Sequence, residues 1–153
     1  MSTTVAQILK AKPDSGRTIY TVTKNDFVYD AIKLMAEKGI GALLVVEGDD
    51  IAGIVTERDY ARKVVLQERS SKATRVEEIM TAKVRYVEPS QSTDECMALM
   101  TEHRMRHLPV LDGGKLIGLI SIGDLVKSVI ADQQFTISQL EHYIHGTPSV
   151  TSV

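Results

Sequence analysis

The sequence predicts an α+β fold in which two tandem β-α-β-β-α repeats pack together with pseudo-twofold symmetry. The first observation is an internal repeat, because segments 43–48 and 53–59 return as 108–113 and 118–124, with every position 65 residues later. The second is that each copy has the same order of short apolar runs and one helical stripe. The third is size: a copy of roughly 60–70 residues buries too little surface to be stable alone, so the two must share an interface.

Each copy begins with a short strand followed by a helix. The expected strands are 19–22 and 84–87. Apolar residues at helical spacing mark the buried faces of the two helices, namely Val28, Ala31, Ile32 and Met35 in the first copy and Cys96, Met97 and Met100 in the second. Ser92 and Glu95 form an S-x-x-E capping box at the second helix, and Asp26 is the expected cap of the first.

Two strands joined by a tight turn come next in each copy. The almost wholly apolar runs 42–46 and 108–111 indicate strands buried on both faces. Glycine and aspartate supply the turn chemistry that follows, and the partner strands are expected at 51–55 and 116–120. Each partner strand carries an interior glycine, Gly53 or Gly118, which predicts the close approach of another backbone or of a ligand.

The domain boundaries follow from the repeat. We expect residues 1–66 to form the first repeat with an N-terminal segment, 67–75 a polar linker, 76–145 the second repeat with a C-terminal helical extension, and 146–153 a flexible tail. A second helix begins after Thr56 and after Ser121, and the last one is expected from 122 to about 140 with a break near Phe135. Residues 12–17 are expected to form an exposed loop.

Composition excludes several classes of protein. The 153 residues are 43% hydrophobic and 25% charged, as in ordinary globular domains, and the net charge of −2 provides no basic surface for nucleic acid. The single cysteine, Cys96, excludes an internal disulfide and is interpreted as a small core residue rather than a nucleophile. No apolar run approaches the roughly 20 residues that span a bilayer, and no leader pattern is present, so we expect a cytoplasmic protein without membrane attachment.

Two motifs have side chains that could bind a ligand. They are T-E-R-D (56–59) and S-I-G-D (121–124), each of which follows a strand and begins a helix. One interpretation is structural, because a hydroxyl residue followed three positions later by an acid is a capping box. The other is functional. A helix start suits a phosphate, the aspartate can accept hydrogen bonds from a ribose diol, and the glycine lets the strand approach a flat base. Two such ends in packed copies would line two clefts related by a pseudo-twofold axis.

The repeated element order and the G-h-h-[ST]-x-x-D ends resemble a tandem pair of CBS (cystathionine β-synthase) domains of the stand-alone bacterial type, over nearly the whole chain. This resemblance implies a non-catalytic regulatory module that binds AMP, ADP, ATP or NAD(H) and signals energy or redox state to a partner protein, with neither a catalytic cofactor nor a metal. It also implies a homodimer. It assigns the first site to Asp59 and Thr56 with Thr21, Val22 and Ala42 near the base, and the second site to Asp124 and Ser121 with Tyr86, Val87, His107 and Pro109 near the base.

The two copies have different basic residues at equivalent positions near the motifs. Arg58, Arg104 and Arg106 are candidate phosphate contacts near the axis, and Arg58 is replaced by Gly123 in the second copy. This asymmetry predicts unequal sites and favours one extended dinucleotide over two mononucleotides. A ligand-independent interaction or scaffold protein is the alternative, with both motif ends acting only as caps. An enzyme acting on a nucleotide is a third hypothesis, which turnover in an ATP or NAD hydrolysis assay would support.

Overall fold

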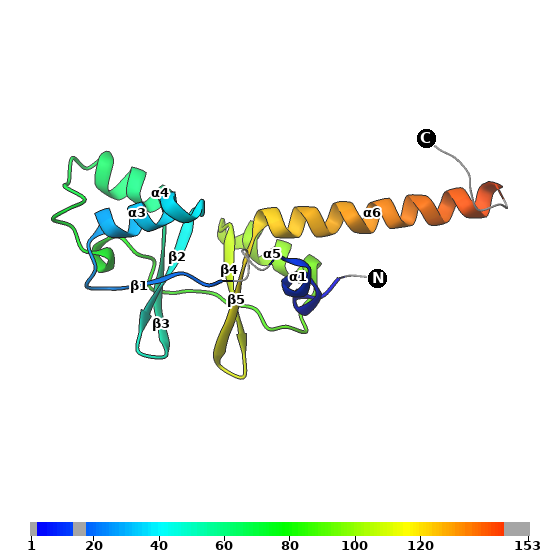
Figure 1. The fold of residues 1–153 in the computed structure, drawn as a ribbon, viewed down its shortest axis with the longest axis horizontal. Helices are drawn as coiled ribbons and strands as arrows, with labels where there is room; N and C mark the ends of the chain where they lie inside the picture. The colour runs from blue at the N-terminus through cyan, green and yellow to red at the C-terminus, as the bar shows by residue number, and fades with distance from the viewer. Residues whose placement is uncertain (1–2, 14–17, 146–153) are drawn as a thin grey trace.

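The computed structural model describes residues 3–13 and 18–145 and contains both predicted repeats in an α+β arrangement (Figure 1). The expected exposed loop at 12–17 lies mostly outside these residues, and the expected flexible tail lies wholly outside them. The elements, in chain order, are α1 (Val5–Ala11), β1 (Thr21–Thr23), α3 (Val28–Lys38), β2 (Ala42–Glu47), β3 (Asp50–Thr56), α4 (Glu57–Tyr60), the π-helix η1 (Ala61–Val65), the 3₁₀-helix η2 (Val76–Glu78), α5 (Thr93–His103), β4 (His107–Asp112), β5 (Lys115–Ser121) and α6 (Ile122–His145).

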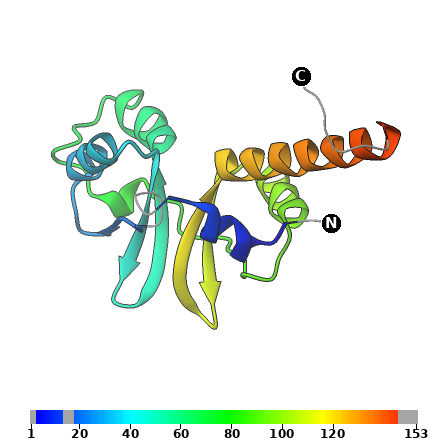
Figure 2. The same cartoon turned by 45° about the vertical axis from the view of Figure 1, so that its right-hand side comes forward.

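The two β-hairpins confirm the 65-residue repeat in register as well as in sequence. Strands β2 and β3 pair antiparallel with Ala42 opposite Thr56, and β4 and β5 pair with the equivalent His107 opposite Ser121. Each hairpin shifts register at the same place, after Val45 and after Val110. The hairpins lie side by side in both views (Figures 1 and 2), so the motif ends of β3 and β5 are brought to the same region of the molecule.

The first strand of each copy differs from its prediction. In the first copy the strand lies two residues later than expected, as β1, and runs parallel to β2. In the second copy the expected strand 84–87 is wrong, because only Val87 forms a bridge, with Val110. The reason lies in Pro109, which stands where Leu44 pairs with β1 and has no N–H to donate to the upstream segment.

Helix starts and ends follow local chemistry with two exceptions. Ser92 and Glu95 form the predicted capping box of α5. Asp26 does not cap α3, because its carboxylate accepts a hydrogen bond from the Thr23 amide instead; the first amides of α3 donate to the linker carbonyls of Thr74 and Ser71. The predicted break near Phe135 is also absent, since α6 is one continuous helix of 24 residues.

Each repeat has its own core, and a third apolar cluster joins them. Met35, Leu43 and Val55 are among the buried residues of the first core. Cys96 is fully buried in the second core, and burial raises the pKa of its thiol to about 11, which fits the predicted packing role. The joining cluster contains Ala42, Leu44 and Ile54 from the first sheet, against which Leu116 and Leu119 of β5 pack. The shared interface that the size argument required is therefore formed by the hairpins.

The segment that leads into each repeat packs on the other repeat. Val5 and Ile8 of α1, at the start of the chain, are buried in the second core, whereas Val76 and Ile79 around η2 are buried in the first. This exchange of leading segments between the repeats is also seen in the backbone bridges. Thr4 pairs with Ser92 at the start of α5, and Phe27 at the start of α3 pairs with Arg75. Separating the repeats would therefore break both cores as well as the interface.

The exchange also explains the two interior strand glycines. A Cβ added to Gly53 would lie 2.7 Å from the Thr81 carbonyl oxygen, and one added to Gly118 would lie 2.7 Å from a methyl carbon of Leu9. The predicted close approach is confirmed. The neighbour is backbone, as predicted, only at Gly53; at Gly118 it is the Leu9 side chain, which was not predicted.

Candidate functional site

Two cavities lie at the junction of the repeats, and each contains one motif end. The larger, of about 1140 Å³, contains Ser121 and Asp124 and is called the Asp124 cavity. The smaller, of about 470 Å³, contains Thr56 and Asp59 and is called the Asp59 cavity. Gly41 and His107 line both. Each cavity takes its motif end from one repeat and its opposite wall from the other, which is the pseudo-symmetric arrangement that the sequence predicted.

Both motif ends are complete capping boxes. The Asp59 amide donates to Thr56 Oγ1 at 3.1 Å, and the Asp59 carboxylate accepts from the Thr56 amide at 2.9 Å. The equivalent distances between Asp124 and Ser121 are 3.1 and 2.9 Å. The first amide of each helix is used as well, since Glu57 donates to the Gly41 carbonyl and Ile122 to that of Arg106. The structural interpretation of the motif therefore holds, and these amides are already engaged before any ligand arrives.

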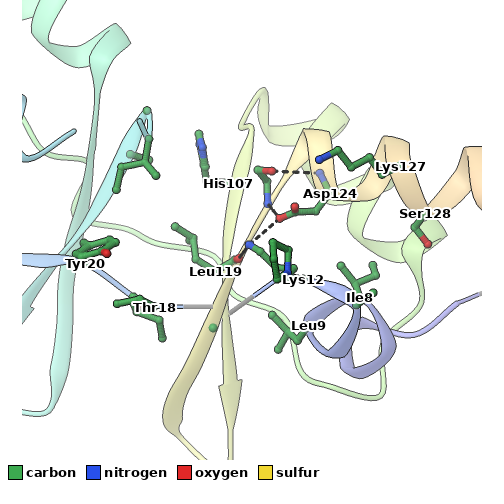
Figure 3. A pocket seen from close by; sticks show the side chains of 18 of the residues that line it. Ile8, Leu9, Lys12, Thr18, Tyr20, His107, Leu119, Asp124, Lys127 and Ser128 are labelled. Atoms are coloured by element: carbon green, nitrogen blue, oxygen red, sulfur yellow. Dashed lines mark hydrogen bonds and ion pairs between the residues drawn. The ribbon is translucent and has the colours of Figure 1, made fainter. Parts of the chain in front are cut away.

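Each motif aspartate also carries a lysine partner. Lys12, just after α1, places Nζ 3.0 Å from Asp124 Oδ2 and 3.0 Å from the Leu119 carbonyl oxygen. Figure 3 shows this contact inside the cavity, with Tyr20 coming from the facing repeat. At the other motif end, Lys63 lies 3.1 Å from Asp59 Oδ1, although Lys63 does not itself line the Asp59 cavity. Both carboxylates are largely buried, with 16% and 14% of their side chains exposed, so each charge is balanced within the protein.

The two cavities differ in charge. The Asp59 cavity is lined by five Lys or Arg side chains against the two acids Glu57 and Asp59; the bases are Arg58, Lys83, Arg85, Arg104 and Arg106. The Asp124 cavity is lined by three bases and three acids, which are Lys12, Lys38, Lys127, Glu37, Asp124 and Asp132. A multiply charged anion is therefore favoured in the smaller cavity and not in the larger one.

His107 stands between the cavities, and its environment keeps it neutral. Burial lowers the pKa of the His107 imidazole below its usual value, and the nearby Lys12 and Arg106 lower it further, while Asp124 acts in the opposite direction. A neutral imidazole offers one donor and one acceptor nitrogen at neutral pH. His107 can thus recognise a polar ligand edge without adding charge.

Comparison with known proteins agrees with this geometry. The sequence matches the family described as "CBS domain" twice, over residues 15–66 and 76–131. The chain belongs to the CBS domain family. It is 43% identical over 152 residues to the CBS domain-containing protein CBSX3, mitochondrial, of Arabidopsis thaliana, a match that covers 95% of this chain and 73% of the relative.

Solved structures of CBS domain proteins have the same fold. A putative signal-transduction protein with CBS domains from Burkholderia ambifaria MC40-6 is 99% identical with a TM-score of 0.83, covering 89% of this chain and 100% of that one. The CBS domain pair of protein MJ0100, solved with 5′-methylthioadenosine and S-adenosyl-L-methionine, is 25% identical with a TM-score of 0.74, covering 86% and 99%. CBS domain pairs of this kind are generally regulatory modules rather than catalysts.

The CBS pair brings together most of the predicted site residues, but not in the predicted groups. Thr56, Arg58, Asp59, Arg104 and Arg106 line the Asp59 cavity, with His107. Ala42, expected beside Asp59, instead lines the Asp124 cavity, with Ser121 and again His107. The remaining candidates lie outside the lining of both cavities, and these are Thr21, Val22, Tyr86, Val87 and Pro109. Val22 and Val87 occupy equivalent positions in the two copies, and each is buried in the core of one repeat.

Sequence reasoning missed the basic residues that precede each repeat. Segment 5–12 reads V-A-Q-I-L-K-A-K, and 76–83 reads V-E-E-I-M-T-A-K, a match at an offset of 71 residues. The two offsets differ by six because, with Lys12 matched to Lys83 and Ile19 to Val84, the six residues 13–18 have no counterpart in the second copy. This second repeat would have paired Lys12 with Lys83, and each of these lysines lines one cavity.

Neither a bilayer span nor a metal cluster is found in the described part of the CBS pair. No helix among residues 3–13 and 18–145 has the length and apolar character needed to cross a bilayer. In the same residues, no three His, Cys, Asp or Glu side chains gather closely enough to hold a metal ion.

The Asp124–Lys12 contact predicts a pH dependence of stability. Burial alone would raise the pKa of the Asp124 carboxyl, but the Ser121 amide and the Lys12 ammonium outweigh it, so the folded-state pKa is lowered. A carboxyl with a lowered folded pKa stabilises the protein above its unfolded pKa of about 3.9, and that stabilisation is lost as pH falls through the folded pKa. In urea unfolding at a series of pH values, the stability difference between wild type and Asp124→Asn should be constant near neutrality and shrink below about pH 4. A difference that stays the same throughout would contradict the assigned role of the ion pair.

Proposed function

We propose that this CBS pair is a non-catalytic regulatory module that binds adenosine-containing ligands (AMP, ADP, ATP or NAD(H)) between its repeats and signals energy or redox state to a partner protein. The observation that carries the proposal is the pair of cavities, each with a T/S-x-x-D end facing the opposite repeat. The structure of the MJ0100 pair with two adenosine derivatives supports the ligand class.

In this proposal the Asp124 cavity receives the nucleoside part of a ligand. Its wall includes apolar side chains from both repeats, among them Ile8, Ile19, Ile40 and Leu119, with Tyr20 on the facing repeat. Apolar and aromatic walls with a few polar groups are typical of small-molecule sites. Among residues 3–13 and 18–145, the contacts to the Asp124 side chain fall on Oδ2, which leaves Oδ1 to accept a hydrogen bond from a ribose hydroxyl.

The Asp59 cavity in turn binds a mononucleotide of its own, or the far end of a dinucleotide, with the phosphate groups among its basic side chains. Arginine binds phosphate through two parallel hydrogen bonds, and the five basic side chains of this cavity outnumber its acids. Because Gly41 and His107 line both cavities, one extended dinucleotide can reach from the neutral cavity into the basic one. This keeps NAD(H) as a candidate beside two separate mononucleotides.

Signalling would follow from the position of the cavities at the joint between repeats. A ligand shifts a conformational equilibrium only by binding one state better than the other. A nucleotide that contacts both repeats meets this condition whenever their separation changes. We further propose a homodimer, for which Val65 (52% exposed) and Leu66 (72% exposed) after α4, and Val126 and Ile130 on α6, offer exposed apolar side chains.

Calorimetric titration of the wild type and of Asp59→Ala and Asp124→Ala with AMP, ADP, ATP, NAD⁺ and NADH tests the proposal. Each variant should lose binding at one cavity and keep it at the other, seen as a fall in stoichiometry for mononucleotides. Thermal shift gives a second readout, because a ligand that binds only the folded state raises the apparent stability. Wild type that binds none of the five ligands would overturn the proposal.

The scaffold alternative predicts a different result from the same variants. Both ends are complete capping boxes, so Asp→Ala would then lower the free energy of unfolding by about 0.5–2 kcal/mol and change no binding. A partner captured equally well with and without nucleotide would favour this alternative.

A further inference from the structure

Helix α6 carries exposed apolar side chains between Val126 and Leu140, and its distal half has no covering element in the described part of the chain. Figures 1 and 2 both show this half extending past α1 and α5. The last described residue of α6 with a side-chain hydrogen bond outside the helix is Asp132, which accepts from Thr3 Oγ1 near the start of the chain. Yet Val126, Ile130, Ile137 and Leu140 are 44%, 51%, 49% and 55% exposed.

The spacing of the stripe is that of a coiled coil. Val126, Ile130, Gln133, Ile137 and Leu140 follow one another at intervals of four, three, four and three residues. Alternating steps of three and four bring side chains to one seam along a helix that pairs with another helix, whereas a wider stripe is typical of packing on a globular core. The stripe covers 15 residues, or roughly 22 Å of helix.

Charges beside the stripe favour a second copy in antiparallel orientation. Lys127 lies seven residues before Gln134 and Glu141 seven residues after it, so the three share one side of the seam. In an antiparallel pair centred on Gln134, Lys127 of each helix lies beside Glu141 of the other. The arrangement also places the two globular bodies at opposite ends of the helix pair.

We propose that the stripe from Val126 to Leu140 forms an antiparallel helix pair with the same stripe of a second copy. The proposal gives the homodimer suggested above a specific interface and rests on that homodimer, but it does not depend on nucleotide binding. Gln133, the one polar residue in the seam, would favour a single register, as isolated polar residues do in coiled coils.

Sedimentation equilibrium of the full chain over a concentration series tests the interface. Wild type should dimerise, and Ile137→Glu and Ile130→Glu should each raise the dimer dissociation constant by about 10-fold or more, because two charges enter the seam. Circular dichroism checks that α6 remains helical. Leu66→Glu is the competing variant, since it places the same charge on the other exposed apolar surface suggested for the homodimer, and it should leave the dimer intact.

Charge exchange and cross-linking test the orientation. Lys127→Glu and Glu141→Lys should each weaken the dimer, and the double variant should restore it. In a Gln134→Cys variant with the buried Cys96 replaced by Ala, a short bismaleimide should cross-link position 134 of one chain to position 134 of the second copy.

The outcomes separate the two proposals. A monomer at every concentration overturns both the homodimer and the helix pair. A dimer that Leu66→Glu disrupts and Ile137→Glu leaves intact overturns the helix pair alone. A double charge variant no stronger than the single ones, without cross-linking at residue 134, overturns the antiparallel register.

Discussion

Gly53→Ala is expected to lower the free energy of unfolding by about 3 kcal/mol, the upper range for a group forced into a well-packed site. The new methyl group would lie 2.7 Å from the Thr81 carbonyl oxygen and 2.8 Å from Met80 Sδ. The carbonyl cannot move aside easily, because it accepts a hydrogen bond from the Ile54 amide at 3.0 Å. Urea unfolding monitored by circular dichroism measures the effect.

Gly118→Ala is the matched control at the equivalent repeat position. Its methyl group would meet only the side-chain carbons of Leu9, which can rotate away, so we expect a loss of about 1 kcal/mol or less. Equal losses in the two variants would show that the Thr81 backbone does not hold the first repeat as described. A larger loss for Gly118→Ala would show that α1 is the more rigid of the two exchanged segments.

Arg58→Gln and Arg106→Gln are each expected to weaken AMP and ATP binding in the Asp59 cavity by about 10-fold or more. Both side chains line the basic cavity, and a hydrogen bond to a charged group contributes about 1.5–3 kcal/mol. Binding of adenosine, which has no phosphate, should change little. Calorimetric titration in an Asp124→Ala background isolates this cavity from the other one.

Lys38→Gln provides the control for that experiment. It removes the same charge from the lining of the Asp124 cavity, where Lys38 Nζ lies 5.2 Å from the centre of the Tyr20 ring. In the Asp124→Ala background it should leave AMP affinity unchanged. Arginine variants that weaken adenosine and AMP equally would place the phosphates elsewhere.

Local patterns predicted most of the fold and both motif ends. The strands, the turn glycines and the helix starts at Glu57 and Ile122 depend on residues within a few positions of one another, so a single sequence contains them. The capping boxes at Thr56 and Ser121 are local for the same reason. The absence of a strand at 84–87 could also have been predicted from the sequence, because Pro109 has no N–H to donate from the neighbouring strand.

Contacts between distant segments were not predicted. Lys12 bonds Asp124 across more than a hundred residues, and nothing near either residue indicates the partner. Ala42 was assigned to the cavity of its own repeat, whereas the packing of the hairpins turns it toward the cavity of the other. Both errors arise from treating each repeat as a closed unit.

The sequence by itself determined that the chain is a duplicated α+β unit whose two T/S-x-x-D ends fall at equivalent helix starts, because repeat spacing, capping chemistry and apolar periodicity are local properties. Only the tertiary structure decided that the leading segment of each repeat packs on the other repeat, and which protein atoms lie against Gly53 and Gly118. It also decided that basic side chains outnumber acids in one cavity, whereas the charges balance in the other. The physical reason is that each of these features depends on how two similar surfaces dock, and burial at an interface between repeats is shared among residues far apart in the chain.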